Sequence, residues 1–277
     1  MDILARLLSK GLIFDSRPEF NGEYQLYRYL VETFDITSNL LVGASDDFFY
    51  LSINPSSLFL LIEPSEDAAR SLLSYSQSRQ INCTISTFPL WQCDARLDFY
   101  LDFTSFYPRR PLEDVAQALE SQLIADPYLQ EMISQSVYCD ERVKGLKTTT
   151  SLDVKGGDQL LKRILNFPQI DFIKLDVEGA EVDVLKGLAQ TVQSASFIQF
   201  EFGTTWFHAG KTIADTLEVI SDEAFFFYVI LRDRIVKVKP NWINTYFFCN
   251  VLATRIDFGE EFYFSNPKKS LPYSKFI

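Results

Sequence analysis

Short apolar runs alternate with amphipathic stretches along almost the whole chain, and this alternation constrains the fold more than any other feature. Runs such as 39–44, 58–62 and 225–231 are apolar at nearly every position, rather than at every second one. Strands of this kind are buried on both faces. Residues 23–34 and 178–192, in contrast, carry apolar side chains at helical spacing. The pattern predicts an α/β fold in which a mostly parallel sheet carries helices on both faces.

Three further elements have local signals. Ser65, with acids after it, opens a helix in a capping pattern, and a second helix is expected over residues 212–220. Residues 231–242 suggest a hairpin-like excursion between two late strands.

Length and charge narrow the class of protein. The chain has 277 residues and a formal net charge of −11, so a nucleic-acid partner is disfavoured, because such partners need a basic surface. The longest apolar run, 224–231, is far shorter than a membrane span, and the amino terminus lacks the features of a signal peptide. We therefore expect one cytoplasmic domain over residues 1–277, with an extension at 1–22 and a helical or loop insertion at 103–150.

The ends of the first two predicted strands supply candidate ligand contacts. Open parallel sheets bind ligands beyond the carboxyl ends of their strands. Gly43, Ala44 and Ser45 follow the first strand, and the glycine permits close approach of the backbone to a ligand. Glu63 closes the second strand, where an acid can accept hydrogen bonds from a ribose. A plain turn at Gly43 and a solvated acid at Glu63 are the alternatives.

The most informative stretch is 170–187, IDFIKLDVEGAEVDVLKG. Asp176, Glu178 and Glu181 crowd the predicted junction between strand and helix. The helix dipole accounts for acids in a first helical turn, which suffices for Glu178 and Glu181. Asp176 directly follows the strand, so we predict that it binds cofactor or acceptor. A magnesium-like ion held by Asp176 and Glu201 is an alternative, although the four scattered cysteines and single histidine give no metal-binding pattern.

The next strand and its loop add candidates for proton transfer. Glu201 lies near the end of the apolar run 197–202, and His208, the sole histidine, follows in the loop. Either side chain can accept a proton from an attacking hydroxyl group, although a lone histidine on a loop is more often an ordinary surface residue. Trp206 and Phe207 are either stacking platforms for an acceptor or ordinary packing residues.

These residues carry a resemblance to a known family. The 170–187 block resembles the signature of the FkbM family of methyltransferases that depend on S-adenosylmethionine. The supporting segments VGASDDFF, IEPS, TTTSLDV, IQFEFG and INTYFFCNVLA follow in that family's order. The resemblance spans roughly residues 23–255. It implies a class I methyltransferase (Rossmann-like) fold with a seven-stranded, mostly parallel sheet, and S-adenosyl-L-methionine as the cofactor.

The resemblance also implies O-methylation of a hydroxyl group, often on a saccharide, a glycolipid or a natural product. Gly43, Ala44, Ser45, Glu63 and Asp176 are then the expected cofactor-binding residues. The catalytic candidates are Asp176, Glu201 and His208. Because the chain is acidic, we expect a neutral or weakly polar acceptor.

The glycine loop departs from the usual pattern of the family. Leu41 replaces an acid, Ser45 replaces an asparagine, and Asp47 replaces a second glycine. The side chain of Asp47 is expected to crowd the amino-acid part of the cofactor. These departures leave open a non-catalytic binding protein that keeps the fold with a degenerate cofactor loop. A nicotinamide-dependent oxidoreductase is disfavoured because the glycine-rich dinucleotide fingerprint is absent.

Overall fold

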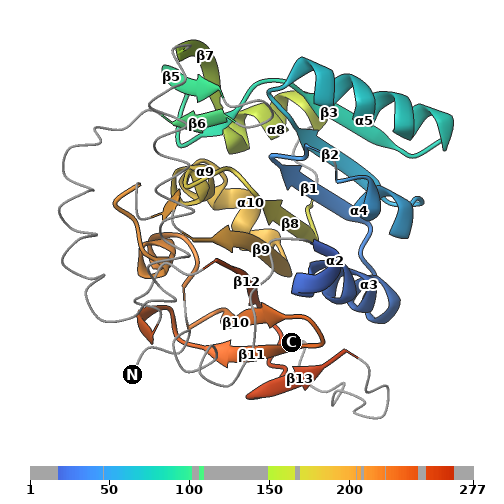
Figure 1. The fold of residues 1–277 in the computed structure, drawn as a ribbon, viewed down its shortest axis with the longest axis vertical. Helices are drawn as coiled ribbons and strands as arrows, with labels where there is room; N and C mark the ends of the chain where they lie inside the picture. Colours follow the sequence, from blue (N-terminus) through green and yellow to red (C-terminus); the bar gives the residue numbers. More distant parts are fainter. Residues whose placement is uncertain are drawn as a thin grey trace.

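A computed structural model of the chain gives the fold (Figure 1). The structure describes residues 18–45, 47–101, 106–108, 149–165, 169–203, 205–206, 209–221, 223–242 and 248–264.

The main sheet has nine strands among the described residues, in the order β13-β11-β10-β12-β9-β8-β1-β2-β3. The strands β3, β2, β1, β8 and β9 are parallel, and β12, β10, β11 and β13 continue the sheet with antiparallel pairs. Their bounds are β1 Ser38–Val42, β2 Leu58–Ile62, β3 Cys83–Ser86, β8 Phe172–Leu175, β9 Phe197–Phe202, β10 Phe226–Leu231, β11 Arg234–Val238, β12 Cys249–Thr254 and β13 Glu261–Tyr263.

The predicted α/β fold is confirmed, but the strand count differs from the expected seven. Strands β3, β2, β1, β8, β9, β12 and β10 form a seven-stranded core with β12 antiparallel. Strand β11 returns from β10 as a hairpin and β13 pairs with it, so two strands extend one edge. The segment 231–242 had indicated this hairpin, whereas nothing in the short stretch at β13 had marked it as a strand.

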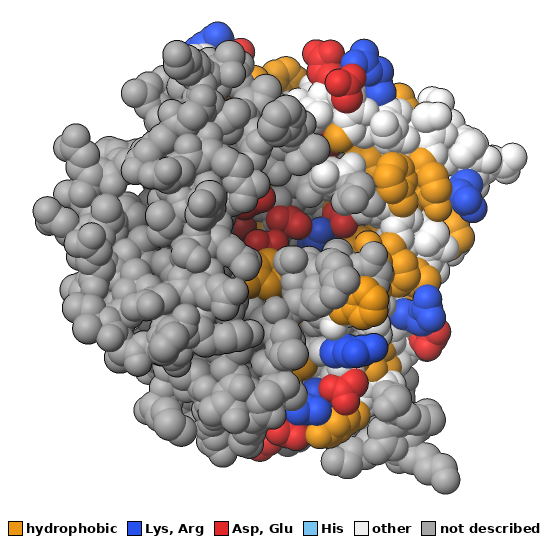
Figure 2. Space-filling model, viewed as in Figure 1, with side chains coloured by type: hydrophobic (Ala, Val, Ile, Leu, Met, Phe, Trp, Pro, Cys, Tyr) orange, Lys and Arg blue, Asp and Glu red, His pale blue; other side chains and the backbone are white. Residues whose placement is uncertain are grey.

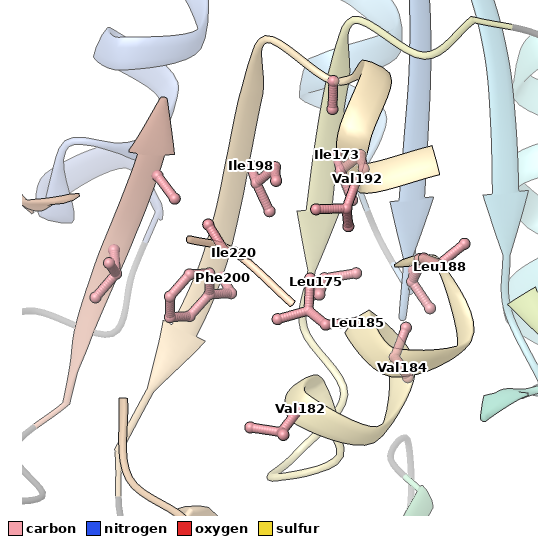
Figure 3. Packing of buried hydrophobic residues seen from close by; sticks show 14 of the residues in the cluster. Ile173, Leu175, Val182, Val184, Leu185, Leu188, Val192, Ile198, Phe200 and Ile220 are labelled. Carbon is pink, nitrogen blue, oxygen red and sulfur yellow. The ribbon is translucent and has the colours of Figure 1, made fainter. Parts of the chain in front are cut away.

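Helices cover both faces of the sheet (Figure 1). Alternate residues of a strand point to opposite faces, so Leu40 and Val42 pack with α8, α9 and α10, whereas Leu41 packs with α3, α4 and α5. Figure 3 shows side chains of α9 and α10, among them Val184, Leu185 and Val192, in one cluster with Ile173 and Leu175 of β8 and Ile198 and Phe200 of β9. The bounds are α2 Pro18–Asn21, α3 Glu23–Thr33, α4 Phe48–Ile53, α5 Glu66–Ser78, α8 Gly157–Leu165, α9 Glu181–Gly187, α10 Ala189–Ser194, and the 3-10 helices η1 Ile213–Glu218 and η2 Pro240–Trp242.

Two predicted helices differ in detail from the observed ones. The expected helix over 178–192 is divided into α9 and α10. Leu188 lies between them, as the C-cap of α9 and the N-cap of α10. The expected helix over 212–220 is a 3-10 helix, started by a capping box in which Thr212 and Asp215 bond each other's backbone.

A second, four-stranded sheet has the order β4-β7-β5-β6, with bounds β4 Leu90–Trp91, β5 Ala95–Leu101, β6 Phe106–Pro108 and β7 Thr149–Gly156. The expected helical or loop insertion at 103–150 therefore contains β6 and the first residues of β7, because both pair with β5. The rest of that range, and residues 1–17 of the expected extension, lie outside the described residues. The single-domain assignment stays a prediction.

Within the described part of the chain, no helix is long and apolar enough to cross a membrane. The cytoplasmic location stays a prediction.

Candidate functional site

The strand order reverses beside β1. The chain runs from β1 outward to β2 and β3, and β8 then pairs on the other side of β1. Loops that leave the carboxyl ends of β1 and β8 therefore diverge to opposite faces of the sheet and leave a crevice between them, which is the usual ligand site of such sheets.

Gly43 lies at the closest approach of these two loops. Its φ is +77°, in the region that favours glycine, and a Cβ at this position would collide with the carbonyl oxygen of Asp176. The Gly43 amide donates to Ile62 O at 2.9 Å, and the Asp176 amide donates to Val42 O at 3.0 Å. The glycine is thus required for the loops after β1 and β8 to meet.

Glu63 joins the glycine loop to the end of β2. Its Oε2 accepts the Ser45 amide at 2.8 Å, and its Oε1 accepts the Ser65 amide at 2.7 Å. Burial raises the pKa of Glu63, although these two hydrogen bonds counteract the rise. Each oxygen retains one acceptor position. The alternative of a solvated acid is wrong, because the side chain is buried.

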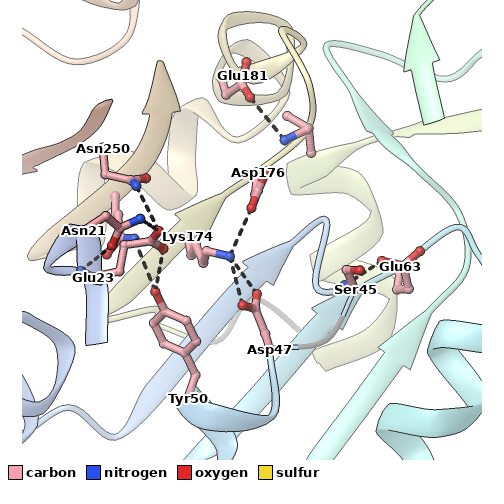
Figure 4. A network of polar contacts seen from close by, with 12 residues as sticks. Asn21, Glu23, Ser45, Asp47, Tyr50, Glu63, Lys174, Asp176, Glu181 and Asn250 are labelled. Carbon is pink, nitrogen blue, oxygen red and sulfur yellow. Dashed lines mark hydrogen bonds and ion pairs between the residues drawn. The ribbon is translucent and has the colours of Figure 1, made fainter. Parts of the chain in front are cut away.

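Lys174 is a buried cation in the centre of the crevice (Figure 4). Its Nζ lies 2.9 Å and 3.0 Å from the two carboxylate oxygens of Asp47, and 3.3 Å from Asp176 Oδ2. Burial alone would lower the pKa of Lys174, but Asp47 and Asp176 raise it well above its ordinary value. Burial raises the pKa of Asp47 to about 7, although Lys174 opposes the rise.

Glu23, at the start of α3, lies behind this ion pair (Figure 4). Its Oε1 accepts from the side-chain amides of Asn21 and Asn250, at 2.6 Å and 2.9 Å. Its Oε2 accepts from Tyr50 Oη at 3.1 Å and Gln199 Nε2 at 2.8 Å. Four neutral donors therefore hold a buried carboxylate, and together they join α3 and α4 to β9 and β12.

Two further carboxyl groups face the crevice from α9 and β9. Burial raises the pKa of Glu181 to about 8, and its Oε1 accepts the Val177 amide at 3.1 Å. Its Oε2 has no hydrogen-bond partner. Burial, followed by the charges of Asp176 and Glu178, raises the pKa of Glu201 well above its ordinary value. Glu181 lies in the first turn of α9, as predicted, but its side chain is buried, which the dipole argument did not indicate.

The loop between β8 and α9 has a strained backbone. Glu178 has a φ of +53° and Gly179 a φ of +91°, and a Cβ on Gly179 would lie 2.5 Å from Thr205 O. A non-glycine residue in this region costs of the order of 1 kcal/mol and is found where the surrounding structure requires it. The close approach of Gly179 to Thr205 packs the 177–180 segment against the loop that follows β9, and this packing maintains the strained backbone.

The structure brings most of the predicted site residues together. Gly43 meets the backbone of Asp176, Ser45 in the same loop bonds to Glu63, and the charge of Asp176 acts on both Glu63 and Glu201, adding to the effect of burial on their pKa values. His208 lies outside the described residues, as does Phe207. Whether these residues act on a ligand stays a prediction.

Trp206 is not a stacking platform. Its side chain is buried, its Nε1 donates to Glu201 O at 2.8 Å, and its ring packs against Phe200 and Phe202. The packing alternative is the observed one.

Sequence reasoning missed the Lys174–Asp47 pair and the role of Glu23. A lysine within an otherwise apolar strand was the available signal for Lys174. Asp47 was expected to crowd the cofactor, but its carboxylate turns toward Lys174 instead. Nothing in the sequence around Glu23 marked it as buried.

Acidic side chains gather around a basic one at the centre of the face drawn in Figure 2. Among the described residues, no group of three or more His, Cys, Asp or Glu side chains is arranged to hold a metal ion. A separate pocket of about 410 Å³ lies between α3, α4 and Phe264 and contains none of the predicted site residues.

A sheet that reverses its order beside β1, with a glycine loop and carboxylates at the strand ends, is the architecture of a Rossmann-like protein, a class of fold that usually binds its ligands at such a crevice. Residues 35–227 match the family model described as "Methyltransferase FkbM domain". The match covers more than half of the 277 residues, and the chain belongs to the FkbM methyltransferase family, as the resemblance had predicted.

Individual relatives are more distant. A segment of 79 residues is 33% identical to the hexuronic acid methyltransferase AglP of Haloferax volcanii, and it covers 28% of this chain and 30% of that relative. A solved FkbM methyltransferase from Methylobacillus flagellatus KT aligns with a TM-score of 0.42 and 14% identity, over 83% of this chain and 47% of its own. An O-methyltransferase from Bacillus cereus in complex with SAH aligns with a TM-score of 0.41 and 10% identity, over 91% and 88%.

Proposed function

We propose that this chain is an O-methyltransferase that uses S-adenosyl-L-methionine to methylate a hydroxyl group of a saccharide or a related small molecule. The observation that carries the proposal is the meeting of the Gly43 loop, Glu63 and Asp176 at one end of the sheet, in a member of a methyltransferase family.

The residues of the crevice fit the cofactor by their chemistry. Glu63 keeps acceptor capacity for the hydroxyl groups of a ribose, because each of its oxygens accepts only one backbone amide. The side chain of Asp176 is 34% exposed, so it remains accessible to a ligand. Its negative charge favours a cation such as a sulfonium.

When bound, S-adenosylmethionine supplies an activated methyl group. The chain contributes orientation and exclusion of water, since methyl transfer to an oxygen needs an in-line arrangement more than covalent help. Asp176 positions the cofactor or the acceptor hydroxyl. Glu201, with His208 as the second candidate, receives the proton that the hydroxyl loses. Burial raises the pKa of Glu201, but the positive charge of a bound sulfonium would favour its ionised form, which is the form that accepts a proton.

The nature of the acceptor follows from charge. Lys174 is neutralised by Asp47 and Asp176, so its ammonium group is already engaged by carboxylates of the chain. Carboxylates accept hydrogen bonds from hydroxyl groups, so we propose a neutral saccharide or similar polyol, rather than a nucleic acid or another polyanion. The relative AglP is named a hexuronic acid methyltransferase, which supports a saccharide acceptor but not its neutral charge, because a hexuronic acid carries a carboxylate.

The test is a calorimetric titration of the purified chain with S-adenosylmethionine and, separately, with NAD, followed by transfer of a tritiated methyl group to a panel of saccharides. We expect binding of S-adenosylmethionine and labelling of a saccharide. Binding of NAD alone would indicate an oxidoreductase, and binding of neither would indicate a protein that kept the fold without the cofactor. Labelling of nucleic acid would contradict the proposed acceptor.

A further inference from the structure

We infer that Lys174 and Asp47 form a clamp: they are positioning residues that hold the loop after β1 against the strand that ends in Asp176. The clamp would keep the cofactor-binding residues of the two loops in register, so this inference rests on the proposed function.

Carboxylate oxygens of the chain satisfy all the hydrogen-bond donors of the Lys174 ammonium group. An ammonium group has three N–H donors. Three carboxylate oxygens surround Lys174 Nζ: the two of Asp47, at 2.9 Å and 3.0 Å, and Asp176 Oδ2 at 3.3 Å. The side chains of Lys174 and Asp47 are 6% and 8% exposed, and the ring of Tyr50 lies 5.4 Å from Nζ.

Asp47 contacts Lys174 with a side chain that would ordinarily cap its own helix. It is the N-cap residue of α4, where an aspartate usually accepts a hydrogen bond from the second or third helical amide. Its side chain makes no such capping bond and turns to Lys174, 127 positions away in sequence. The carboxylate therefore links two loops instead of stabilising its own helix.

The clamp acts directly on the glycine loop. The Asp47 amide donates to Ala44 O at 2.8 Å and closes the 44–47 turn. The same turn carries Ser45, whose amide binds Glu63. Fixing Asp47 therefore fixes the turn that contains Ala44 and Ser45, while the second contact of Lys174 fixes the side chain of Asp176.

Asp47 stands where the family resemblance led us to expect a glycine, and its carboxylate forms an ion pair with Lys174. Because the Asp47 carboxylate is bound to Lys174, this additional negative charge is neutralised within the chain and does not have to be accommodated by the cofactor. The other charged or titratable groups that act on Lys174 are Asp176, Tyr50 and Glu23, and Glu23 is held by its own four donors.

The test is the double variant Lys174→Met/Asp47→Asn. Removing one partner leaves a buried unpaired charge and can unfold the chain, whereas removing both avoids this penalty. The double variant should keep a melting temperature close to that of the wild type. A purely structural pair would then leave cofactor binding unchanged, but a clamp predicts a dissociation constant for S-adenosylmethionine that is at least about 10-fold higher, within the range of coupled neighbouring sites.

Hydrogen exchange gives a second readout that needs no cofactor. The amides of Gly43, Ala44 and Asp47 should exchange at least about 10-fold faster in the double variant, while those of β10 should not change. The control variant, Lys155→Met/Asp94→Asn, removes an ion pair of 3.1 Å in the small sheet and should alter neither readout. If the double variant does not fold, the single variant Asp47→Asn, which leaves Lys174 paired with Asp176, replaces it in both measurements.

Wild-type affinity with unchanged loop exchange would overturn the clamp. Tighter binding of S-adenosylmethionine by the variant would overturn it as well, because Asp47 would then be competing with the cofactor. If the wild-type chain binds no S-adenosylmethionine, the proposed function fails, and the exchange rates still decide whether the clamp exists.

Discussion

The two ends of strand β8 carry aspartates in opposite situations. Asp171, at the amino end, accepts the Thr37 amide, the Thr37 hydroxyl and the Ser38 amide on one oxygen, at 2.9, 2.8 and 3.1 Å. The side chain of Asp176, at the carboxyl end, accepts a single hydrogen bond among the described residues, from Lys174, and is 34% exposed.

The difference shows that carboxylates at the two edges of one sheet have different roles, one in holding strands together and the other in remaining available to a ligand. At the amino ends, the Thr37 amide and hydroxyl, just before β1, and the Ser38 amide, at its start, supply the donors, so Asp171 ties β1 to β8. At the carboxyl ends, the loops diverge and leave carboxylates with acceptor capacity that the fold does not use. We therefore expect a change at Asp171 to affect stability and a change at Asp176 to affect binding and turnover.

The largest expected effect concerns Glu181 and pH. Burial raises the pKa of Glu181 to about 8 from 4.5, so the folded chain binds this proton more tightly than the unfolded chain does. The stability that the proton provides is present below pH 4.5 and is lost as the pH rises through 8. We expect Glu181 to lower the free energy of unfolding by about 3 kcal/mol between pH 5 and pH 8.

Urea unfolding of the wild type and of Glu181→Gln at both pH values measures this effect. The glutamine keeps the size of the side chain and can still accept the Val177 amide, so the fall in stability with pH should be smaller. Asp171→Asn serves as the control and should keep the wild-type fall. Equal falls in all three proteins would exclude Glu181 as the responsible group.

Asp176→Asn tests whether the exposed aspartate belongs to the chemistry. The change keeps size and removes the charge, so we expect turnover to fall by about 10²-fold or more, equivalent to about 2.7 kcal/mol. The melting temperature should shift only slightly. Methyl transfer measured under saturating cofactor checks the prediction, and wild-type turnover in this variant would place the active centre elsewhere.

Glu63→Ala tests the carboxyl end of β2. Losing hydrogen bonds to a charged group should weaken binding of S-adenosylmethionine by about 1.5–3 kcal/mol. Isothermal titration calorimetry gives the value, and Glu66→Ala, one helical position beyond the Ser65 cap, is the matched control. An unchanged dissociation constant would remove Glu63 from the cofactor site.

The smallest effect is expected at the amino end. Asp171→Asn exchanges a carboxylate acceptor for an amide, and its oxygen can still accept some of the donors from Thr37 and Ser38. We expect a loss of about 1 kcal/mol in the free energy of unfolding and unchanged turnover per folded molecule. A variant of normal stability and impaired turnover would reverse the comparison between the two ends of β8.

Much of the fold follows from local pattern. The apolar runs predicted β1, β2, β9 and β10, and helical spacing predicted α3. Ser65 was predicted to start a helix, and its side chain accepts the Ala68 amide at the start of α5. These elements were predictable because their signals arise from residues a few positions apart. The strand Phe106–Pro108 was not predicted, because its identity depends on pairing with β5.

The candidate site was predictable only where strand ends could be located. Gly43, Glu63 and Asp176 follow strands, so the rule for parallel sheets placed them at one edge. The contacts of Lys174 and Glu23 could not be predicted in the same way. Each depends on which strands become neighbours, and neither partner carries a local signal for the other.

The sequence by itself determined the alternation of strands and helices in the parallel part of the main sheet, the acids at the strand ends and the family signature of residues 170–187. Only the tertiary structure decided that Asp47 meets Lys174, that Glu23 lies buried among four donors, and that Trp206 belongs to the core. The physical reason is that periodicity records which face of an element is apolar. The pairing of β1 with β8, and the partners available to a buried charge, are fixed only when the whole sheet assembles.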